Sequence, residues 1–276
     1  MTGTTATILS LTAILLASSH VRAEQSVDQI LCGNEVYRNA NPDCARLASP
    51  QQTALAGLFQ AGVAAMRSGQ WDTAIASFTK LVDTDPNYKD AYFALYSLGL
   101  AYNAKRDFAH AVPFFDKAIA KEAAIAMAYE GRGDAYSELG NPKAALADFD
   151  RVIALEPKRA SGYAARARQK LKDRDAAGAL ADLDRAIELN PRDSRSLYGR
   201  SLIRGNSRNY DLALADLSKA IEIDPGFSAA YTQRGMIYVQ SGKPDQARDA
   251  FNAALKLNPG DTRPRKALEA LPAKKD

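Results

Sequence analysis

Few residues of this sequence have the types and spacing that catalysis or metal binding requires. The chain has 36 Lys and Arg, 32 Asp and Glu, 2 histidines and 2 cysteines. His20 lies in an N-terminal stretch that we expect to be removed, which leaves His110 in the mature chain. The sequence contains no Gly-x-Ser-x-Gly motif, no phosphate-binding glycine loop and no paired histidines. It therefore predicts no catalytic residues, no metal site and no cofactor.

The two cysteines, Cys32 and Cys44, lie close together near the N-terminus. An even number of cysteines in an exported protein favours a disulfide. Closing this short loop would contribute roughly 2–3 kcal/mol in the chain-entropy picture. Two buried thiols are the alternative, whereas a zinc site would need about four soft ligands. We predict a Cys32–Cys44 disulfide.

Charged residues recur at regular intervals. Each of three aspartates follows an arginine by sixteen residues, in the pairs Arg132 and Asp148, Arg166 and Asp182, and Arg200 and Asp216. The series is either a ligand-binding ladder or a repeated contact between neighbouring helices, and we favour the contact. Each such exposed pair would contribute about 0–1 kcal/mol. The net charge of +4 is spread along the chain, which argues against a nucleic-acid partner.

Residues 1–23 have the pattern of a signal peptide. The apolar stretch Ile8–Ala17 is well below the roughly twenty residues that a membrane-spanning helix needs. Val21 and Ala23 suit the small-residue positions before a cleavage site, although no Lys or Arg precedes the apolar stretch. An uncleaved anchor or an N-terminal amphipathic helix is the alternative. We expect cleavage after Ala23 and a periplasmic or secreted protein.

A period of 34 residues runs through most of the chain. Pro157, Pro191, Pro225 and Pro259 follow this spacing and end similar strings. In every unit a small residue is followed twelve residues later by alanine, and a large apolar residue comes four residues after that. The small residues are Gly62, Gly99, Gly133, Ala167, Ser201 and Gly235, and the large ones are Phe78, Phe115, Phe149, Leu183, Leu217 and Phe251. The pattern predicts antiparallel helices that approach closely where one side chain is small.

The unit resembles the tetratricopeptide repeat, with Tyr129-x-x-Arg-Gly-x-x-Tyr136, Ala145, Phe149 and Pro157 in the third copy. The resemblance implies an all-α fold, in which six helix-turn-helix repeats form a right-handed superhelix (α-solenoid). Together with the signal-peptide pattern, it suggests an exported protein of bacterial type. The repeats are 55–88, 92–125, 126–159, 160–193, 194–227 and 228–261. We expect residues 24–54 to cap the first repeat and residues 262–276 to form a C-terminal capping helix and tail.

Glycine, polar and proline residues predict how the helices begin and end. Gly69, Gly140 and Gly242 should end first helices in the left-handed conformation. The residues expected to cap second helices are Asp107, Asn141, Asp175 and Asn209. Three extra residues precede Gly99, and we expect them to lengthen that first helix by nearly a turn. Pro113 should kink its helix.

The resemblance also implies a partner-binding surface, because proteins of this family bind on a concave face lined by the first helices. The corresponding residues are Phe59, Phe93, Tyr96, Glu130, Asp134, Arg168, Lys172 and Arg195. Aromatic residues come first and basic residues last, which predicts a partner with an apolar end and an acidic end. For each residue, an ordinary solvated surface is the alternative. The family's clamp for a terminal carboxylate is not reproduced, since Tyr96, Leu100 and Ala164 stand at its positions.

These observations favour a non-enzymatic scaffold or adaptor. Its partner would be a protein or peptide bound in the concave groove, and its role would be in assembly of the cell envelope. The alternative is a structural subunit of a larger periplasmic complex, with contacts on its convex face or its caps. We expect no membrane span after cleavage of the signal peptide.

Overall fold

The computed structural model describes residues 50–272, which form helices and no strands. The helices are α5 (Pro50–Arg67), α6 (Trp71–Thr84), α7 (Ala91–Ala104), α8 (Phe108–Lys121), α9 (Ala126–Glu138), α10 (Pro142–Leu155), α11 (Ala160–Lys172), α12 (Ala176–Leu189), α13 (Ser194–Asn206), α14 (Tyr210–Ile223), α15 (Ser228–Gln240), α16 (Pro244–Leu257) and α17 (Thr262–Glu269). The expected signal peptide and both cysteines lie outside the described residues, so cleavage and the disulfide stay predictions. None of the described helices is both long and apolar enough to span a membrane.

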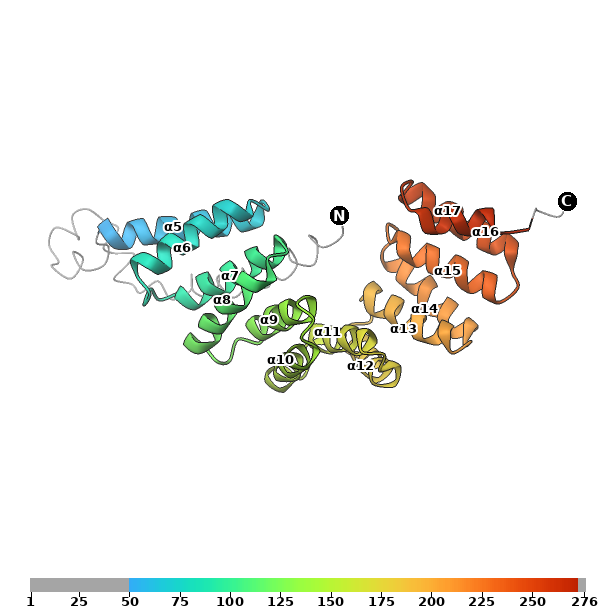
Figure 1. The fold of residues 1–276 in the computed structure, drawn as a ribbon, viewed down its shortest axis with the longest axis horizontal. Coiled ribbons are helices and arrows are strands. Elements are labelled where there is room, and N and C mark those ends of the chain that lie inside the picture. The colour runs from blue at the N-terminus through green and yellow to red at the C-terminus, as the bar shows by residue number, and fades with distance from the viewer. Residues whose placement is uncertain (1–49, 273–276) are drawn as a thin grey trace, which may run out of the picture. The chain divides into compact units, whose positions relative to one another are not determined.

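The chain divides into two compact units, with unit 1 ending at Asn141 and unit 2 beginning at Pro142. Unit 1 contains α5 to α9, and unit 2 contains α10 to α17. Within each unit, consecutive helices pack against one another (Figure 1). The predicted all-α fold of helix-turn-helix repeats is confirmed.

Close helix packing depends on small residues where helices meet, both at the repeated position, as at Gly99 and Gly235, and two residues before it, as at Gly131. Phe115 of α8 is fully buried between Gly99 of α7 and Gly131 of α9. A Cβ atom would come within 2.7 Å of the Phe115 ring at Gly99 and within 2.5 Å at Gly131. In unit 2, a Cβ atom at Gly235 would lie 2.4 Å from Phe251. These distances are shorter than any normal contact, so a larger residue there would push the helices apart.

The ends of the first helices have the predicted left-handed conformation. The φ angles of Gly69, Gly140 and Gly242 are +69°, +74° and +73°. The equivalent positions in the other described repeats hold Arg106, Arg174 and Arg208. Their φ angles of +62° to +63° are also left-handed. The turn is therefore kept where glycine is absent, although the left-handed conformation is less favourable for arginine than for glycine.

The predicted caps of the second helices are confirmed at two positions. The carboxylates of Asp107 and Asp175 accept hydrogen bonds from the backbone N–H groups of His110 and Gly178, at 3.4 and 2.8 Å. Asn209 occupies the predicted position before α14, but its side chain makes no capping hydrogen bond. The residue type therefore locates the start of a helix better than it predicts the bond.

The prediction that three extra residues lengthen the first helix of the second repeat is wrong. That helix, α7, has 14 residues, whereas α9 and α11 have 13. The connection before α7 covers residues 85–90, whereas the connection before α9 covers residues 122–125. One extra residue therefore enters the helix and the others enter the connection, where added length strains no packed contact. The next helix, α8, is continuous through Pro113.

Both described ends differ in part from the sequence expectation. At the C-terminal end, α17 packs against α15 and α16, which agrees with the predicted capping helix. At the other end, α5 begins at Pro50, so residues 50–54 belong to a helix and not to a separate cap. This first helix has 18 residues and is longer than the first helices that follow.

Replacement of Ala213 by leucine tests the helix packing. Ala213 is 0% exposed in α14, so the added carbons have no space and should lower the free energy of unfolding by about 1–3 kcal/mol. Chemical denaturation of the full chain measures the change. Ala215→Leu is the matched control, since this alanine lies on the exposed side of the same helix. Equal losses in the two variants would mean that the helix interface is misplaced.

Candidate partner-binding surfaces

Unit 1 carries an aromatic surface, by which we mean Phe59 of α5, Tyr88 of the connection before α7, and Phe93 of α7. All three side chains are half-buried. The Phe59 ring centroid lies 5.5 Å from that of Phe93 and 6.1 Å from that of Tyr88. Rings at these separations attract one another beyond the apolar area that they bury. The surface is therefore held in place before any partner binds.

Buried aromatic rings support this surface from below. Phe59 contacts the fully buried Phe78 with a centroid distance of 6.0 Å. Phe93 contacts Tyr96 at 6.3 Å, and Tyr96 contacts Phe115 at 6.1 Å. Tyr96 is only 3% exposed, so this sequence-predicted site residue can support Phe93 but has almost no surface to offer a partner.

Two tyrosines near the surface were not among the residues selected from the sequence. Tyr88 lies in the lengthened connection, outside the first-helix positions that the family resemblance indicates, and Tyr92 is 37% exposed at the start of α7. Burial raises the pKa of Tyr88, and Asp90 and Asp85 raise it further. Burial also raises the pKa of Tyr92, with smaller contributions from Asp90 and Glu122. Both phenols are therefore neutral hydrogen-bonding groups at physiological pH.

The charged residues predicted for the site lie in both units. Glu130 and Asp134 are half-buried in α9, which belongs to unit 1. Arg168 and Lys172 of α11 and Arg195 of α13 are exposed in unit 2. Each of the five already takes part in an interaction within the protein. The predicted order from aromatic to basic residues along one groove stays a prediction.

Hydrogen bonds join the arginine and the aspartate of two of the three predicted pairs, between the two helices of one repeat. Arg166 of α11 donates from Nε and Nη2 to the carboxylate of Asp182 in α12, at 2.9 and 2.6 Å. Its Nη1 donates to Asp150 of α10 at 2.7 Å. Arg200 of α13 repeats this arrangement, with Asp216 at 2.7 and 3.0 Å and Asp184 at 2.8 Å. Each guanidinium thus connects its own repeat to the preceding one.

We call these arginine–aspartate contacts of unit 2 the ladder, and its aspartates are less exposed than the sequence analysis expected. Asp182 and Asp216 are each 4% exposed, because they lie under their arginine partners. Lys170 and Arg204 add a second cation to each aspartate, at 2.8 Å. The carboxylates of the preceding repeats were not selected from the sequence, although Asp116, Asp150 and Asp184 also recur every 34 residues. Removal of one partner should therefore cost more than it does in an exposed ion pair, because it leaves the other charge buried and uncompensated.

The cations determine the ionisation of Asp182. Burial raises its pKa, but hydrogen bonds from Arg166 and Lys170 lower it by more, so the pKa lies below its usual value. The Asp182 hydrogen bond in turn raises the pKa of Arg166. Both groups therefore stay charged across the physiological pH range.

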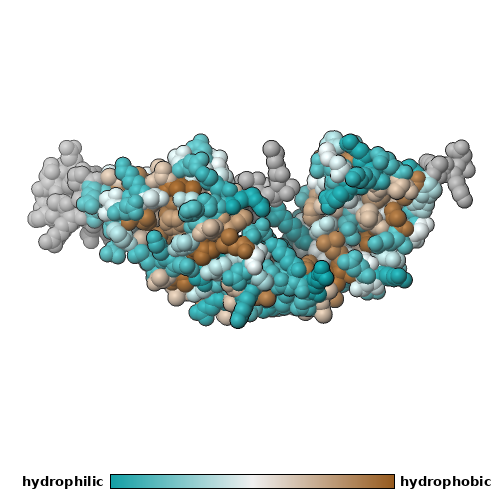
Figure 2. Space-filling model, viewed as in Figure 1, coloured by the Kyte–Doolittle hydropathy of each residue, from teal (hydrophilic) through white to brown (hydrophobic). Residues whose placement is uncertain are grey.

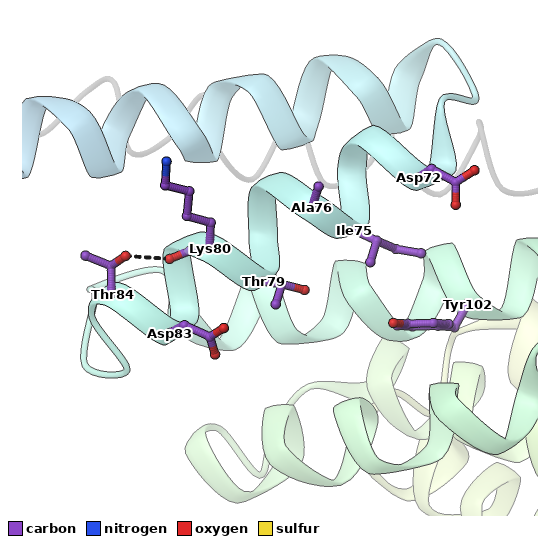
Figure 3. Close-up of a pocket in the computed structure, with 8 residues that line it drawn as sticks. All are labelled: Asp72, Ile75, Ala76, Thr79, Lys80, Asp83, Thr84 and Tyr102. Atoms are coloured by element: carbon purple, nitrogen blue, oxygen red, sulfur yellow. Dashed lines mark hydrogen bonds between the residues drawn. The ribbon is translucent and has the colours of Figure 1, made fainter.

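A shallow cleft of about 570 Å³ lies in unit 1, lined by α6 and by Tyr102 of α7 (Figure 3). Three charged side chains reach it, but Asp72, Lys80 and Asp83 point in different directions in Figure 3 and do not converge on one position. Asp72 accepts a hydrogen bond from Lys105. Among residues 50–272, no group of three or more His, Cys, Asp or Glu residues could hold a metal ion. The cleft thus lacks the convergent groups of a catalytic site.

Models of the tetratricopeptide repeat match residues 59–128, 126–159, 164–226 and 207–271. The chain therefore belongs to the tetratricopeptide repeat family. A search of curated proteins found no match.

Several solved structures share the fold. YrrB, described as a tetratricopeptide-repeat protein with an unusual peptide-binding site, is 22% identical with a TM-score of 0.53, covering 70% of this chain and 97% of YrrB. PilF of Pseudomonas aeruginosa is 15% identical with a TM-score of 0.68, covering 80% and 99%. PilW, described as a type IV pilus biogenesis factor, is 16% identical with a TM-score of 0.56, covering 60% and 77%. At these identities the similarity establishes the fold.

Replacement of Asp182 by asparagine tests the ladder. The change removes the charge that Arg166 and Lys170 neutralise, and should lower the free energy of unfolding at pH 7 by about 1–3 kcal/mol. Because the folded-state pKa of Asp182 is lowered, its contribution is present above the unfolded pKa of about 3.9 and is lost as the pH falls through the folded-state value. Denaturation of both proteins from pH 7 downwards measures the difference, which should shrink below about pH 4.

Asp150→Asn is the control, because Asp150 contacts the same Arg166 from a position that is 60% exposed. It should cost less than about 1 kcal/mol. A loss that is equal in the two variants, or that is independent of pH for Asp182→Asn, would contradict this account of the ladder.

Proposed function

We propose that this protein is a non-enzymatic adaptor that binds a peptide or protein partner, and that the aromatic surface of unit 1 anchors an apolar segment of that partner. The observation that carries the proposal is the contact of the half-buried Phe59 and Phe93 rings at 5.5 Å above a buried aromatic layer. Aromatic side chains held in this way lose little freedom on binding and bury a large apolar area.

Three further observations support binding over catalysis. The chain belongs to a repeat family, and repeat arrays offer extended surfaces to partners. The structurally similar YrrB is described as having a peptide-binding site. Apolar residues of unit 1 reach the surface in Figure 2, surrounded by hydrophilic ones. Such partly exposed apolar areas commonly mark contact sites.

The proposal places the protein in the bacterial periplasm or outside the cell, with a role in envelope assembly. Its support is the signal-peptide pattern of residues 1–23 and the description of the similar PilW as a pilus biogenesis factor. Intact-mass analysis of protein from an envelope fraction should give a mature chain that begins at Glu24. A mass that includes residues 1–23 would contradict cleavage.

Crosslinked co-purification from an envelope fraction tests the aromatic surface. Phe93→Ala should raise the dissociation rate of the partner by about tenfold or more, because it removes a desolvated anchor next to Phe59. A photoreactive residue at the exposed Tyr92 would identify the partner segment by mass spectrometry. Dissociation rates are then measured with the identified segment.

Phe114→Ala is the matched control. This phenylalanine is also half-buried in unit 1, but it stacks on Tyr102 with a centroid distance of 5.4 Å and does not belong to the aromatic surface. Loss of binding in Phe93→Ala but not in Phe114→Ala supports the proposal. Equal partner binding by Phe93→Ala and the unmodified protein overturns it.

The second candidate is a structural subunit that uses its second helices. Leu212 of α14 and Leu257 of α16 are 53% and 44% exposed in unit 2, and a contact with a partner subunit would bury them. If the aromatic surface fails the test above, crosslinks should map to these helices.

A further inference from the structure

Arg234 of α15 occupies the ladder position of repeat 6 but lacks the ladder's carboxylates. Arg132, Arg166, Arg200 and Arg234 are each 34 residues apart, at the seventh residue of their repeats. The aspartates that bind Arg200 are Asp184 and Asp216. Adding 34 to each number gives Ser218 and Ala250, neither of which carries a charge.

The guanidinium of Arg234 consequently has an unsatisfied donor. Its Nε atom, which donates to Asp182 and Asp216 in the paired arginines, is buried and has no hydrogen-bond partner. The guanidinium carbon lies 5.1 Å from the centre of the Tyr231 ring, much as that of Arg166 lies 5.8 Å from the ring of Tyr163. Arg234 therefore stacks on a tyrosine as the paired arginine does, but without the carboxylates.

The equivalent repeats indicate from which side an anion would approach. Asp182 and Asp216 are buried, and their equivalent Ala250 is also buried, at 2% exposed. Asp150 and Asp184, by contrast, are 60% and 52% exposed, and both bind Nη1 of their arginines. Their equivalent, Ser218, is exposed. In the register of the ladder, solvent therefore reaches the position beside Ser218 where the other repeats place an aspartate.

We propose that Arg234, with Ser218, forms a second partner-contact site in unit 2, which takes an aspartate or glutamate side chain of a protein partner. The partner would supply the carboxylate that repeat 6 lacks. Nη1 of Arg234 would donate to it as Nη1 of Arg166 and Arg200 donate at 2.7 and 2.8 Å, and the Ser218 hydroxyl is a further donor. The proposal rests on the chain having a protein partner but not on the aromatic surface of unit 1.

Fluorescence anisotropy with a labelled hexa-aspartate peptide tests this site on the full chain. Arg234→Gln should weaken binding about tenfold, because a charge-assisted hydrogen bond is lost. Ser218→Asp should weaken it to a similar degree, since it places a carboxylate inside the ladder where the partner's would bind. In ¹H–¹⁵N spectra, the Arg234 Nε–H signal should shift on peptide addition, whereas the signals of the paired Arg166 and Arg200 should stay in place.

Lys219→Gln is the matched control. It removes an exposed cation next to Ser218 in the sequence, one that pairs with Glu222, and should change binding less than about twofold. Unchanged binding in Arg234→Gln or Ser218→Asp, or equal losses in all three variants, would overturn the proposal. Displacement of the peptide by inorganic phosphate at the peptide's own concentration would also overturn it, since the site would then be one for small anions. Hexa-aspartate has no apolar side chain for the aromatic surface, so this test and the dissociation-rate test of the aromatic surface can fail independently.

Discussion

The contact between a glycine of one helix and a phenylalanine of its neighbour is the constraint on which the rest of the structure depends. Phe115 fills the space that Gly99 and Gly131 leave, and Phe251 does the same against Gly235. The missing side chain lets the two helices lie close, and the large ring fills the space and excludes water from their interface. The spacing of helices, and with it the surface that each helix exposes, follows from these contacts.

The aromatic surface and the ladder are consequences of this packing. Phe59 and Phe93 come within 5.5 Å because α5 and α7 are both set by α6, which packs against each of them. In unit 2, the same repeat distance brings Arg166 to carboxylates before and after it along the chain. The arginine and its two carboxylates thus recur together in successive repeats of unit 2 that keep the 34-residue spacing. Where the carboxylates are missing, as around Arg234, a buried donor that is satisfied in the other repeats has no partner.

Much of the fold was predictable because it depends on local periodicity. The 34-residue spacing predicted the bounds of the repeats. Gly69, Gly140 and Gly242 predicted where first helices end, because only glycine adopts a left-handed conformation without strain. The left-handed Arg174 was not predictable from its type. The inserted residues before α7 were assigned to the helix when most lie in the connection, because pattern alone does not distinguish an added helical turn from a longer loop.

The sequence selected candidate site residues by their place in the repeat, which does not determine their exposure. The family register selected Phe59 and Phe93, which are half-buried, and it also selected Tyr96, which the packing buries. It could not select Tyr88, which lies outside any helix. Burial depends on contacts between helices distant in sequence, and a register counted along one helix does not contain them.

A double-mutant cycle at Gly235 and Phe251 measures the central constraint most directly. Gly235→Ala should lower the free energy of unfolding by about 1–3 kcal/mol, because its Cβ would meet the Phe251 ring, and by clearly less in the Phe251→Leu background. Gly57→Ala, at an open helix position, should instead stabilise by about 0.5–1 kcal/mol. If Gly235→Ala stabilises like Gly57→Ala, or costs the same in both backgrounds, close packing against the phenylalanine does not hold this fold together.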